Sequence, residues 1–184
     1  MSASSDKILV LDRDGVINVD INGFIGCPTL WHPIDGSLDA LVKAQQAGFR
    51  LAVATNQSGV GRGIFSAEDL QSVHEKMEFI LAERGVKLDI IEHCPHAPEE
   101  GCDCRKPEPG MLEAIERQLA VDLQGAWFVG DSVRDLQAAV AHGMQPVLVL
   151  TGNGQTSLAD PECPANTLVF DDLAHCVDAL LIQQ

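Results

Sequence analysis

Apolar runs of strand length alternate along this chain with segments whose apolar residues recur at helical spacing. Short apolar runs bounded by glycine, proline or polar residues indicate strands. Such runs lie at residues 7–11, 50–55, 88–93, 126–129 and 146–150, with a weaker one at 167–170. Helical periodicity fills the intervals at residues 35–46, 66–84, 110–120, 132–142 and 173–181. Strand and helix therefore alternate along the whole chain.

Local signals agree with this alternation. Ser66 followed by Asp69 has the pattern of a capping box, and Gly143 stands where a helix would end. Residues 51–54 are continuously apolar, as in a parallel strand that is buried on both faces. The sequence thus predicts an α/β fold, with a Rossmann-like parallel sheet and helices on both of its faces. With 184 residues, 46% of them hydrophobic, we expect one domain spanning residues 1–184.

The chain is strongly acidic, with a formal net charge of −15 at pH 7. This charge repels nucleic acid and anionic membrane surfaces, so neither is an expected partner. No apolar run of about 18 residues occurs, and the polar start of the chain lacks a signal-peptide pattern, so we expect a cytoplasmic protein. We separately expect a monomer, without a specific sequence signal for it. Five basic residues nevertheless lie in or beside the candidate loops: Arg13, Arg62, Arg105, Lys106 and Arg134. Cations gathered in this way indicate an anion-binding site.

Three of the six cysteines crowd together with a histidine, in the order Cys94, His96, Cys102 and Cys104. The spacing Cys-x-His-x5-Cys-x-Cys offers four thiolate and imidazole ligands, which suits a structural Zn²⁺ better than a disulfide in a reducing compartment. The alternative is an incidental cluster on a loop. The remaining cysteines are expected to be ordinary thiols: Cys27, Cys163 and Cys176.

The first apolar run ends abruptly in Asp12-Arg13-Asp14-Gly15. Side chains alternate along an extended chain, so Asp12 and Asp14 can lean to the same side, while Gly15 permits a sharp exit. Two carboxylates about 4 Å apart repel by about 4 kcal/mol at an effective dielectric near 20, which favours a divalent cation between them. The alternative is an Asp-rich turn without chemistry.

Three other strand ends supply polar residues that can join this pair. The second strand ends in residues 55–58, Thr-Asn-Gln-Ser, whose hydroxyl and backbone N–H groups can hold phosphate oxygens. Lys106 follows the proposed zinc ligands, and Asp131 follows the fourth strand at a helix start, where it can cap the helix, bind a metal or do both. Asp135 shares that helix face and can support Asp131. Taken singly, each segment also fits an ordinary loop, but ligands bind at the carboxyl ends of parallel strands, so we expect these residues to converge.

The ordered set Asp12/Asp14, Thr55, Lys106 and Asp131 closely resembles the four motifs of the haloacid dehalogenase (HAD) superfamily of aspartyl-nucleophile phosphatases. The resemblance covers nearly the whole chain. It implies that Asp12 attacks phosphorus to form an aspartyl-phosphate, and that Asp14 is the general acid and then the general base. It also implies that Thr55 and Lys106 hold the transferring oxygens. Finally, it implies Mg²⁺ bound by Asp12, the backbone carbonyl of Asp14 and Asp131, with Asp135 in support.

Substrate specificity is expected to come from loops, because only short segments separate the motifs and no separate cap domain fits between them. The zinc-braced loop, residues 94–106, is the first candidate. Segments such as Cys-Asp-Cys-Arg-Lys-Pro and Thr-Asn-Gln-Ser-Gly-Val-Gly-Arg-Gly resemble the D-glycero-D-manno-heptose-1,7-bisphosphate 7-phosphatases of bacterial heptose biosynthesis, which supplies lipopolysaccharide core and S-layer precursors. The related histidinol-phosphate phosphatases are the alternative, with which this chain shares the short gap between His96 and Cys102.

The resemblance implies a small phosphorylated sugar as the substrate. Arg105 can reach toward a second phosphate, which favours the heptose family over the alternative. The substrate contacts implied in this way are Asp20, Asn22, Gly23, Asn56, Gln57, Ser58, Arg105 and Ser132.

Two hypotheses from other classes stay open on the sequence. A phospho-aspartate receiver domain of signalling also combines Asp, Mg²⁺, Thr and Lys on an α/β sheet. A zinc-dependent interaction module would leave the acidic set unused. The zinc spacing and the position of Asp14 beside the nucleophile stand against a receiver, and steady phosphate release would separate an enzyme from both.

Overall fold

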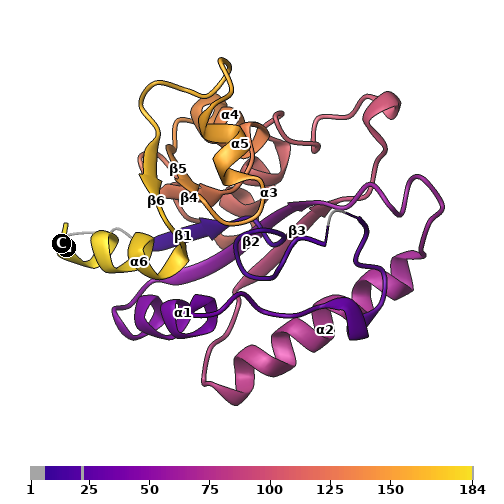
Figure 1. Cartoon of the computed structure of the whole chain (residues 1–184), viewed down its shortest axis with the longest axis horizontal. Coiled ribbons are helices and arrows are strands. Elements are labelled where there is room, and N and C mark those ends of the chain that lie inside the picture. The colour runs from indigo at the N-terminus through magenta and orange to yellow at the C-terminus, as the bar shows by residue number, and fades with distance from the viewer. Residues whose placement is uncertain (1–6, 22, 184) are drawn as a thin grey trace.

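The computed structural model describes residues 7–21 and 23–183, and within them it forms one six-stranded parallel sheet (Figure 1). The strand order is β3-β2-β1-β4-β5-β6, and every neighbouring pair runs parallel. The strands are β1 (Ile8–Leu11), β2 (Arg50–Asn56), β3 (Ile90–Cys94), β4 (Trp127–Gly130), β5 (Gln145–Val149) and β6 (Leu168–Phe170).

Helices cover both faces of the sheet. The α-helices are α1 (Ser37–Gln46), α2 (Ala67–Glu83), α3 (Gly110–Leu119), α4 (Val133–His142), α5 (Gly154–Leu158) and α6 (Leu173–Ile182). Two short 3₁₀ helices are η1 (Pro28–Leu30) and η2 (Pro98–Glu100). Figure 1 shows α1, α2 and α6 on one side of the sheet, with α3, α4 and α5 on the other.

Two apolar cores result, one on each face. Along β1, Leu9 and Leu11 belong to the core under α1, α2 and α6, whereas Ile8 and Val10 belong to the core under α3 and α4. Successive side chains of a strand point to opposite faces, so a strand covered on both sides must be apolar at every position. This requirement explains the unbroken apolar runs in the sequence.

The sequence predictions for the fold are confirmed at nearly every element, with ends that shift by one or two residues. The capping box is present: Asp69 N donates to Ser66 Oγ (3.0 Å), and Ser66 N donates to Asp69 Oδ2 (2.8 Å). Gly143 ends α4 at φ +91°, a conformation that glycine adopts without strain. Helix α5 was not predicted, because its five residues lie in the segment 151–166 and are too few to show helical periodicity.

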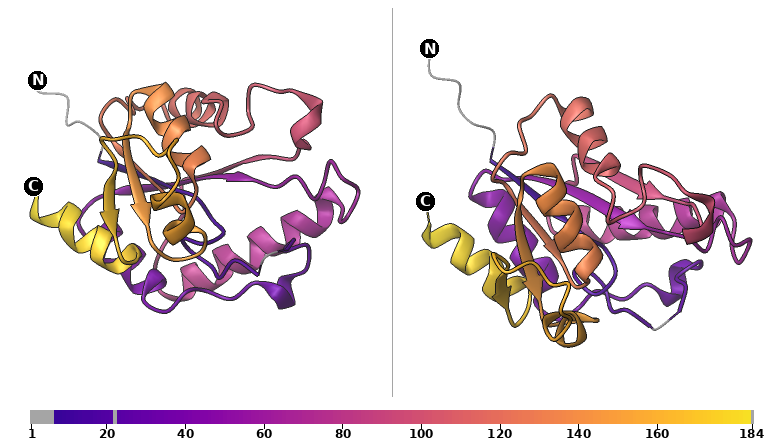
Figure 2. Two further views of the ribbon diagram at one scale, coloured as in Figure 1. Left: turned by 45° about the horizontal axis from the view of Figure 1, so that its top comes forward. Right: turned by 90° about the horizontal axis from the view of Figure 1, so that it is seen from above.

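The strand order creates the place for a site. The chain runs outward from β1 to β2 and β3, then returns to add β4 on the other side of β1. Loops after β1 and β4 therefore leave in opposite directions and open a crevice at the carboxyl ends of these two strands. Figure 2 shows the loops after β2 and β3 extending beyond the same end of the sheet.

Candidate active site and metal centres

Asp12 lies at the centre of the crevice, directly after β1. Its backbone N–H donates to Val129 O of β4 (2.8 Å), which fixes the residue at the strand junction. Its Oδ1 accepts from the backbone N–H of Arg13 (2.7 Å) and lies 3.0 Å from Lys106 Nζ. Burial and the nearby Asp135 carboxylate raise the pKa of Asp12 to about 7, although Lys106 opposes this shift. Asp12 thus needs positive charge nearby to stay ionised.

Lys106 supplies part of that charge from the loop after the proposed zinc ligands. Its ammonium is buried, donates to Ala54 O (2.8 Å) and lies 2.6 Å from Asp135 Oδ1. The Asn56 side chain holds the Lys106 backbone at both its N–H and its carbonyl, each at 3.1 Å. Burial alone would lower the pKa of Lys106, but the two carboxylates outweigh it and raise the pKa. Lys106 is therefore a fixed cation.

Asp131 follows β4 and completes the acidic group. Its Oδ2 accepts from the backbone N–H (2.8 Å) and the Nδ2 (3.1 Å) of Asn153. Gly15 (φ +78°) and Gly152 (φ +55°) pack so closely that a Cβ would lie 2.1 and 2.2 Å from this oxygen. Burial, Asp135 and Asp12 raise the pKa of Asp131 to about 8.

The acidic group fits a divalent cation. Asp12, Asp131 and Asp135 are all buried, and each offers an oxygen within 4.8 Å of the other two. Three carboxylates against the one ammonium of Lys106 leave a net charge of −2, which Mg²⁺ would neutralise with the hard oxygen ligands it prefers. Asp135 also accepts from Ser132 N (3.0 Å) and Ser132 Oγ (2.7 Å), as expected of a supporting residue.

The Asp14 side chain lies outside the acidic group and is held by hydrogen-bond partners of its own. Its side chain accepts from the buried Arg13 guanidinium (Nη2, 2.9 and 3.0 Å), Asn18 Nδ2 (2.8 Å) and Gln57 Nε2 (2.9 Å). Burial alone would raise its pKa, but the Arg13 charge and the Asn18 and Gln57 hydrogen bonds leave the pKa of Asp14 lowered. Gln57 Nε2 also donates to Thr55 Oγ1 (2.9 Å), so one amide links Asp14 to Thr55. The Asp14 carboxylate is not in the metal cluster; its backbone carbonyl remains the predicted ligand.

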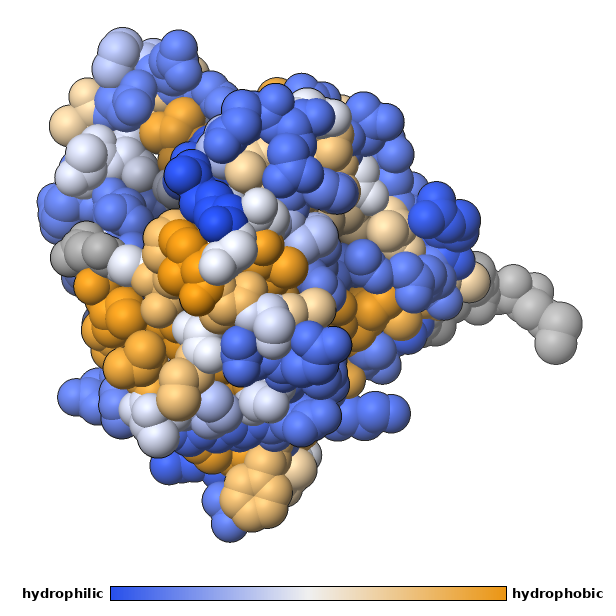
Figure 3. All heavy atoms as spheres, turned by 90° about the vertical axis from the view of Figure 1, so that its right-hand side faces the viewer, coloured by the Kyte–Doolittle hydropathy of each residue, from blue (hydrophilic) through white to orange (hydrophobic). Residues whose placement is uncertain are grey.

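These residues line a cavity of about 180 Å³. Six predicted substrate contacts line it together: Asp20, Gly23, Asn56, Gln57, Ser58 and Ser132. Arg105 does not; it lines a neighbouring hollow that shares Lys106 and Arg134 with the cavity. Asn22 lies outside the described residues. Phe24 and Ile25 add an apolar wall to the cavity. Figure 3 shows apolar side chains gathered beside hydrophilic ones on the face of the molecule toward which the loops after β2 and β3 extend.

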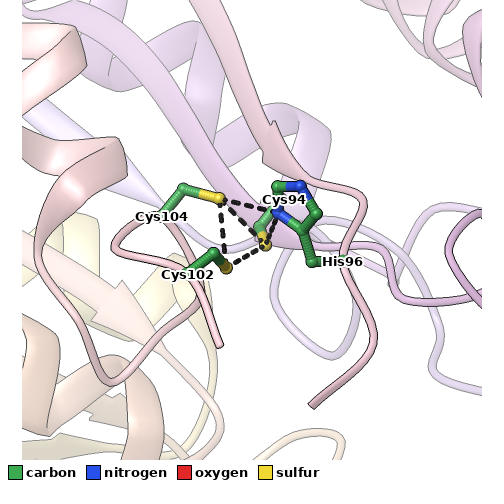
Figure 4. A group of neighbouring side chains, drawn as sticks. All are labelled: Cys94, His96, Cys102 and Cys104. Atoms are coloured by element: carbon green, nitrogen blue, oxygen red, sulfur yellow. Dashed lines mark hydrogen bonds between the residues drawn. The ribbon is translucent and has the colours of Figure 1, made fainter. Parts of the chain in front are cut away.

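The cysteine and histidine cluster closes into a second metal-binding group (Figure 4). Cys104 Sγ lies 3.1 Å from Cys94 Sγ, 3.5 Å from Cys102 Sγ and 3.2 Å from His96 Nδ1. Sulfur ligands about 2.3 Å from a tetrahedral zinc stand about 3.8 Å from one another, so a small expansion of the group admits the ion. Burial raises the pKa of the Cys94 thiol, and a bound cation would reverse that effect. The four residues therefore fit a structural Zn²⁺.

Comparison with known proteins places this geometry in a class. A HAD-hydrolase-like family model matches residues 103–176. The crystal structure of D,D-heptose 1,7-bisphosphate phosphatase from Bordetella bronchiseptica, complexed with magnesium and phosphate, superimposes with a TM-score of 0.93 at 47% identity, covering 97% of this chain and 99% of that one. The corresponding structure from Burkholderia thailandensis gives a TM-score of 0.76 at 39% identity, covering 95% and 98%. Fold and site thus define a phosphatase of the HAD superfamily without a separate cap domain among the described residues.

Sequence relatives narrow the class further. The D-glycero-β-D-manno-heptose-1,7-bisphosphate 7-phosphatase of Pseudomonas putida is 51% identical over 95% of this chain and 99% of its own length. The same enzyme of Pseudomonas aeruginosa is 50% identical over 96% and 99%. The chain belongs to this family of phosphoric monoester hydrolases. These relatives do not favour the three alternative hypotheses, which are a histidinol-phosphate phosphatase, a receiver domain and a zinc-dependent interaction module.

Some supporting residues were not predicted. Arg13, Asn18 and Asn153 hold the Asp14 and Asp131 carboxylates, and Gly152 gives Asp131 its room. The sequence holds a usable signal for Gly152 and Asn153, because Thr-Gly-Asn follows the fifth strand and the site is built from strand ends.

None of the helices in the described part of the chain is both long and apolar enough to span a bilayer.

Proposed function

We propose that this protein removes the 7-phosphate of D-glycero-β-D-manno-heptose 1,7-bisphosphate, with Mg²⁺ as cofactor and Asp12 as nucleophile. The observation that carries the proposal is the meeting of Asp12, Lys106 and Asp131 at the carboxyl ends of β1 and β4. The names of the relatives support the substrate and its anomer. Bound magnesium, held by Asp12, Asp131 and the Asp14 carbonyl, would supply the positive charge that keeps the carboxylates ionised and screens the phosphoryl oxygens.

In the first step, Asp12 forms a bond to phosphorus while the bond from phosphorus to the sugar oxygen O7 breaks. Asp12 Oδ1 already accepts from Arg13 N–H and faces Lys106, so we assign the attack to Oδ2. Asp14 donates its proton to O7, which leaves as the alcohol. Since the pKa of Asp14 is lowered in the ligand-free site, the approaching phosphate dianion must raise it before the proton is taken up.

In the second step, a water oxygen attacks phosphorus and the aspartyl-phosphate bond breaks. The carboxylate of Asp14 accepts the water proton, and the products are inorganic phosphate and free Asp12. Lys106 can contact the transferring oxygens while it faces Asp12. Thr55 Oγ1 accepts from Gln57, which directs its own hydroxyl proton away from that amide and makes it available to a phosphoryl oxygen.

The same proposal includes the setting of the enzyme. Residues 1–184 would act as one domain and as a cytoplasmic monomer in the heptose branch of lipopolysaccharide core or S-layer precursor synthesis. The net charge of −15 supports a soluble protein that binds neither nucleic acid nor membranes. Sedimentation equilibrium tests the monomer directly, and a concentration-independent dimer mass would contradict it.

The deciding experiment compares phosphate release from three substrates in the presence of Mg²⁺. We expect heptose 1,7-bisphosphate to give a kcat/KM far above those of histidinol phosphate and fructose 1,6-bisphosphate. A higher value for histidinol phosphate would overturn the substrate assignment but leave the phosphatase mechanism in place. A single turnover per chain on every substrate would overturn the hydrolase mechanism.

A further inference from the structure

Three arginines near the active site, Arg62, Arg105 and Arg134, have no acidic partner in the described part of the chain. Several other cations of this chain pair with carboxylates: Arg13 with Asp14 (2.9 Å), Lys43 with Asp178 (2.8 Å), and Lys106 with Asp12 and Asp135. In a chain with a net charge of −15, acidic groups are plentiful, so unneutralised cations at one place indicate an anionic ligand.

Arg134 has the central position among them. It is an exposed residue in the first turn of α4, three residues after the metal-site residue Asp131. It lines the active-site cavity together with Asp12 and Ser132. It also lines the hollow on the zinc-loop side, which Arg105 and Pro98 share. A molecule that extends from the nucleophile toward the zinc loop therefore passes Arg134.

Arg105 faces Arg134 from that loop. Its Nη1 donates to His96 O (3.3 Å), so the loop that carries the zinc ligands also orients this guanidinium. Arg105 and Arg134 line the same hollow, so their like charges lie on one side of the active-site cavity. Two guanidinium groups that converge from different elements, with no carboxylate paired to either among the described residues, form a receptor for a dianion.

We propose that Arg134 is a specificity-determining residue, which joins Arg105 in binding the phosphate of the substrate that is not cleaved. The inference rests on the proposed function, because only a bisphosphate carries such a group. While Asp12 receives one phosphate at the end of β1, the second lies at the edge of the cavity between α4 and the zinc loop. Arg134 takes no part in bond making, and its contribution is selection of a bisphosphate over a monophosphate.

The test measures kcat/KM for heptose 1,7-bisphosphate and for heptose 7-phosphate, which lacks the remote group, and compares their ratio among variants. We expect Arg134→Ala and Arg134→Gln to lower this selectivity ratio roughly 10- to 100-fold, the range expected on losing a charged hydrogen-bond partner. The loss should come from a higher KM for the bisphosphate. Arg134→Lys, which keeps the charge but not the planar fork, should fall between these variants and the wild type.

Arg117→Ala is the matched control, because Arg117 is exposed on α3 and its loss changes the net charge equally. We expect its selectivity ratio to equal that of the wild type. A ratio unchanged in both Arg134→Ala and Arg134→Gln, or lowered as much by Arg117→Ala, would overturn the role of Arg134. Failure of the wild type to hydrolyse the bisphosphate at all would instead overturn the proposed function. Melting curves of the exposed-site variants identify any loss that arises from unfolding.

Discussion

The ammonium of Lys106 lies 3.0 Å from Asp12 Oδ1, although the two residues are 94 positions apart in the chain (106 minus 12). The same ammonium lies 2.6 Å from Asp135 Oδ1 and donates to Ala54 O (2.8 Å). Lys106 thus connects the ends of β1 and β2 with the start of α4. Lys106 holds the Asp12 side chain in place and screens the Asp12 charge from the Asp135 carboxylate.

Substituting Lys106 by Met is therefore expected to affect both catalysis and stability. The kcat should fall roughly 100-fold or more, because a fixed cation at the phosphoryl group is lost. Without Mg²⁺ the free energy of unfolding should fall by roughly 3–5 kcal/mol, since two buried carboxylates lose their counter-ion. Lys43→Met is the control: it breaks only the exposed pair with Asp178 and should cost about 1 kcal/mol or less. Urea titrations and phosphate release measure both effects, and a full-rate Lys106→Met enzyme would contradict the assignment.

Asp12→Asn should abolish turnover and leave the fold intact. An amide has nearly the shape of the carboxylate but is a poor nucleophile toward phosphorus, so kcat is expected to drop by several orders of magnitude. The substitution also removes one of the buried carboxylates that repel one another, so the melting temperature of the metal-free protein should not fall. The exposed Asp171→Asn serves as the control and should keep the wild-type rate. Turnover near the wild-type level would exclude Asp12 as the nucleophile.

The sequence predicts most of this architecture because its physical signals are local. Strands buried on both faces must be apolar throughout, and parallel strands bring their carboxyl ends together, so polar residues at strand ends identify a site. The same logic reaches Asp12 and Asp131 without coordinates, while Lys106 is indicated by its place directly after the proposed zinc ligands. The zinc ligands are equally local, since all four lie between Cys94 and Cys104.

Tertiary contacts that depend on loop conformation were beyond such reasoning. Nothing in the sequence states that Arg13 is buried and turned onto Asp14, or that the Asn153 side chain reaches both Asp131 and Asp20. Likewise, nothing in the sequence states that Arg105 lines a hollow beside the cavity while Arg134 lines both. Positions of this kind depend on where two loops meet, which no single segment encodes.

Zinc removal should lower stability and activity together. Arg105 and Lys106 directly follow Cys104, the last proposed zinc ligand, so loss of the ion is expected to disorder residues 94–106 and displace both cations. Cys102→Ser should reproduce this effect, with a lower melting temperature and less bound zinc, whereas Cys163→Ser should not, because Cys163 lies outside the cluster. Elemental analysis must accompany each melting curve. Protein proven free of zinc that melts and turns over normally would refute a structural role for the ion.

Gly152→Ala should weaken magnesium binding. A Cβ at Gly152 would lie 2.2 Å from Asp131 Oδ2, so the carboxylate must shift, and we expect a roughly 10- to 100-fold loss of affinity. Gly125→Ala is a close control: Gly125 has φ +73°, but a Cβ there would meet no described atom within 4 Å. Both variants should lose about 1–2 kcal/mol from the left-handed backbone, and Gly152→Ala should lose more, because its Cβ would also lie 2.7 Å from Gly15 Cα. Only Gly152→Ala should need more Mg²⁺ for half-maximal activity. Equal Mg²⁺ requirements would show that Asp131 does not depend on this close approach.

His74 should make stability depend on pH in a defined window. It is buried on α2, and burial, the Arg13 charge and His93 lower its pKa from 6.5 to about 3. Below pH 6.5 the unfolded chain therefore binds a proton that the folded chain refuses, and stability falls as the pH falls toward 3. The difference in unfolding free energy between wild type and His74→Leu should change by about 1.4 kcal/mol per pH unit between about pH 6 and 4, since common carboxylates cancel. His32→Leu is the control, because it removes an exposed histidine and leaves His74 in place. If the unfolding free-energy difference changes no more steeply with pH for His74→Leu than for His32→Leu, His74 is not a buried neutral imidazole.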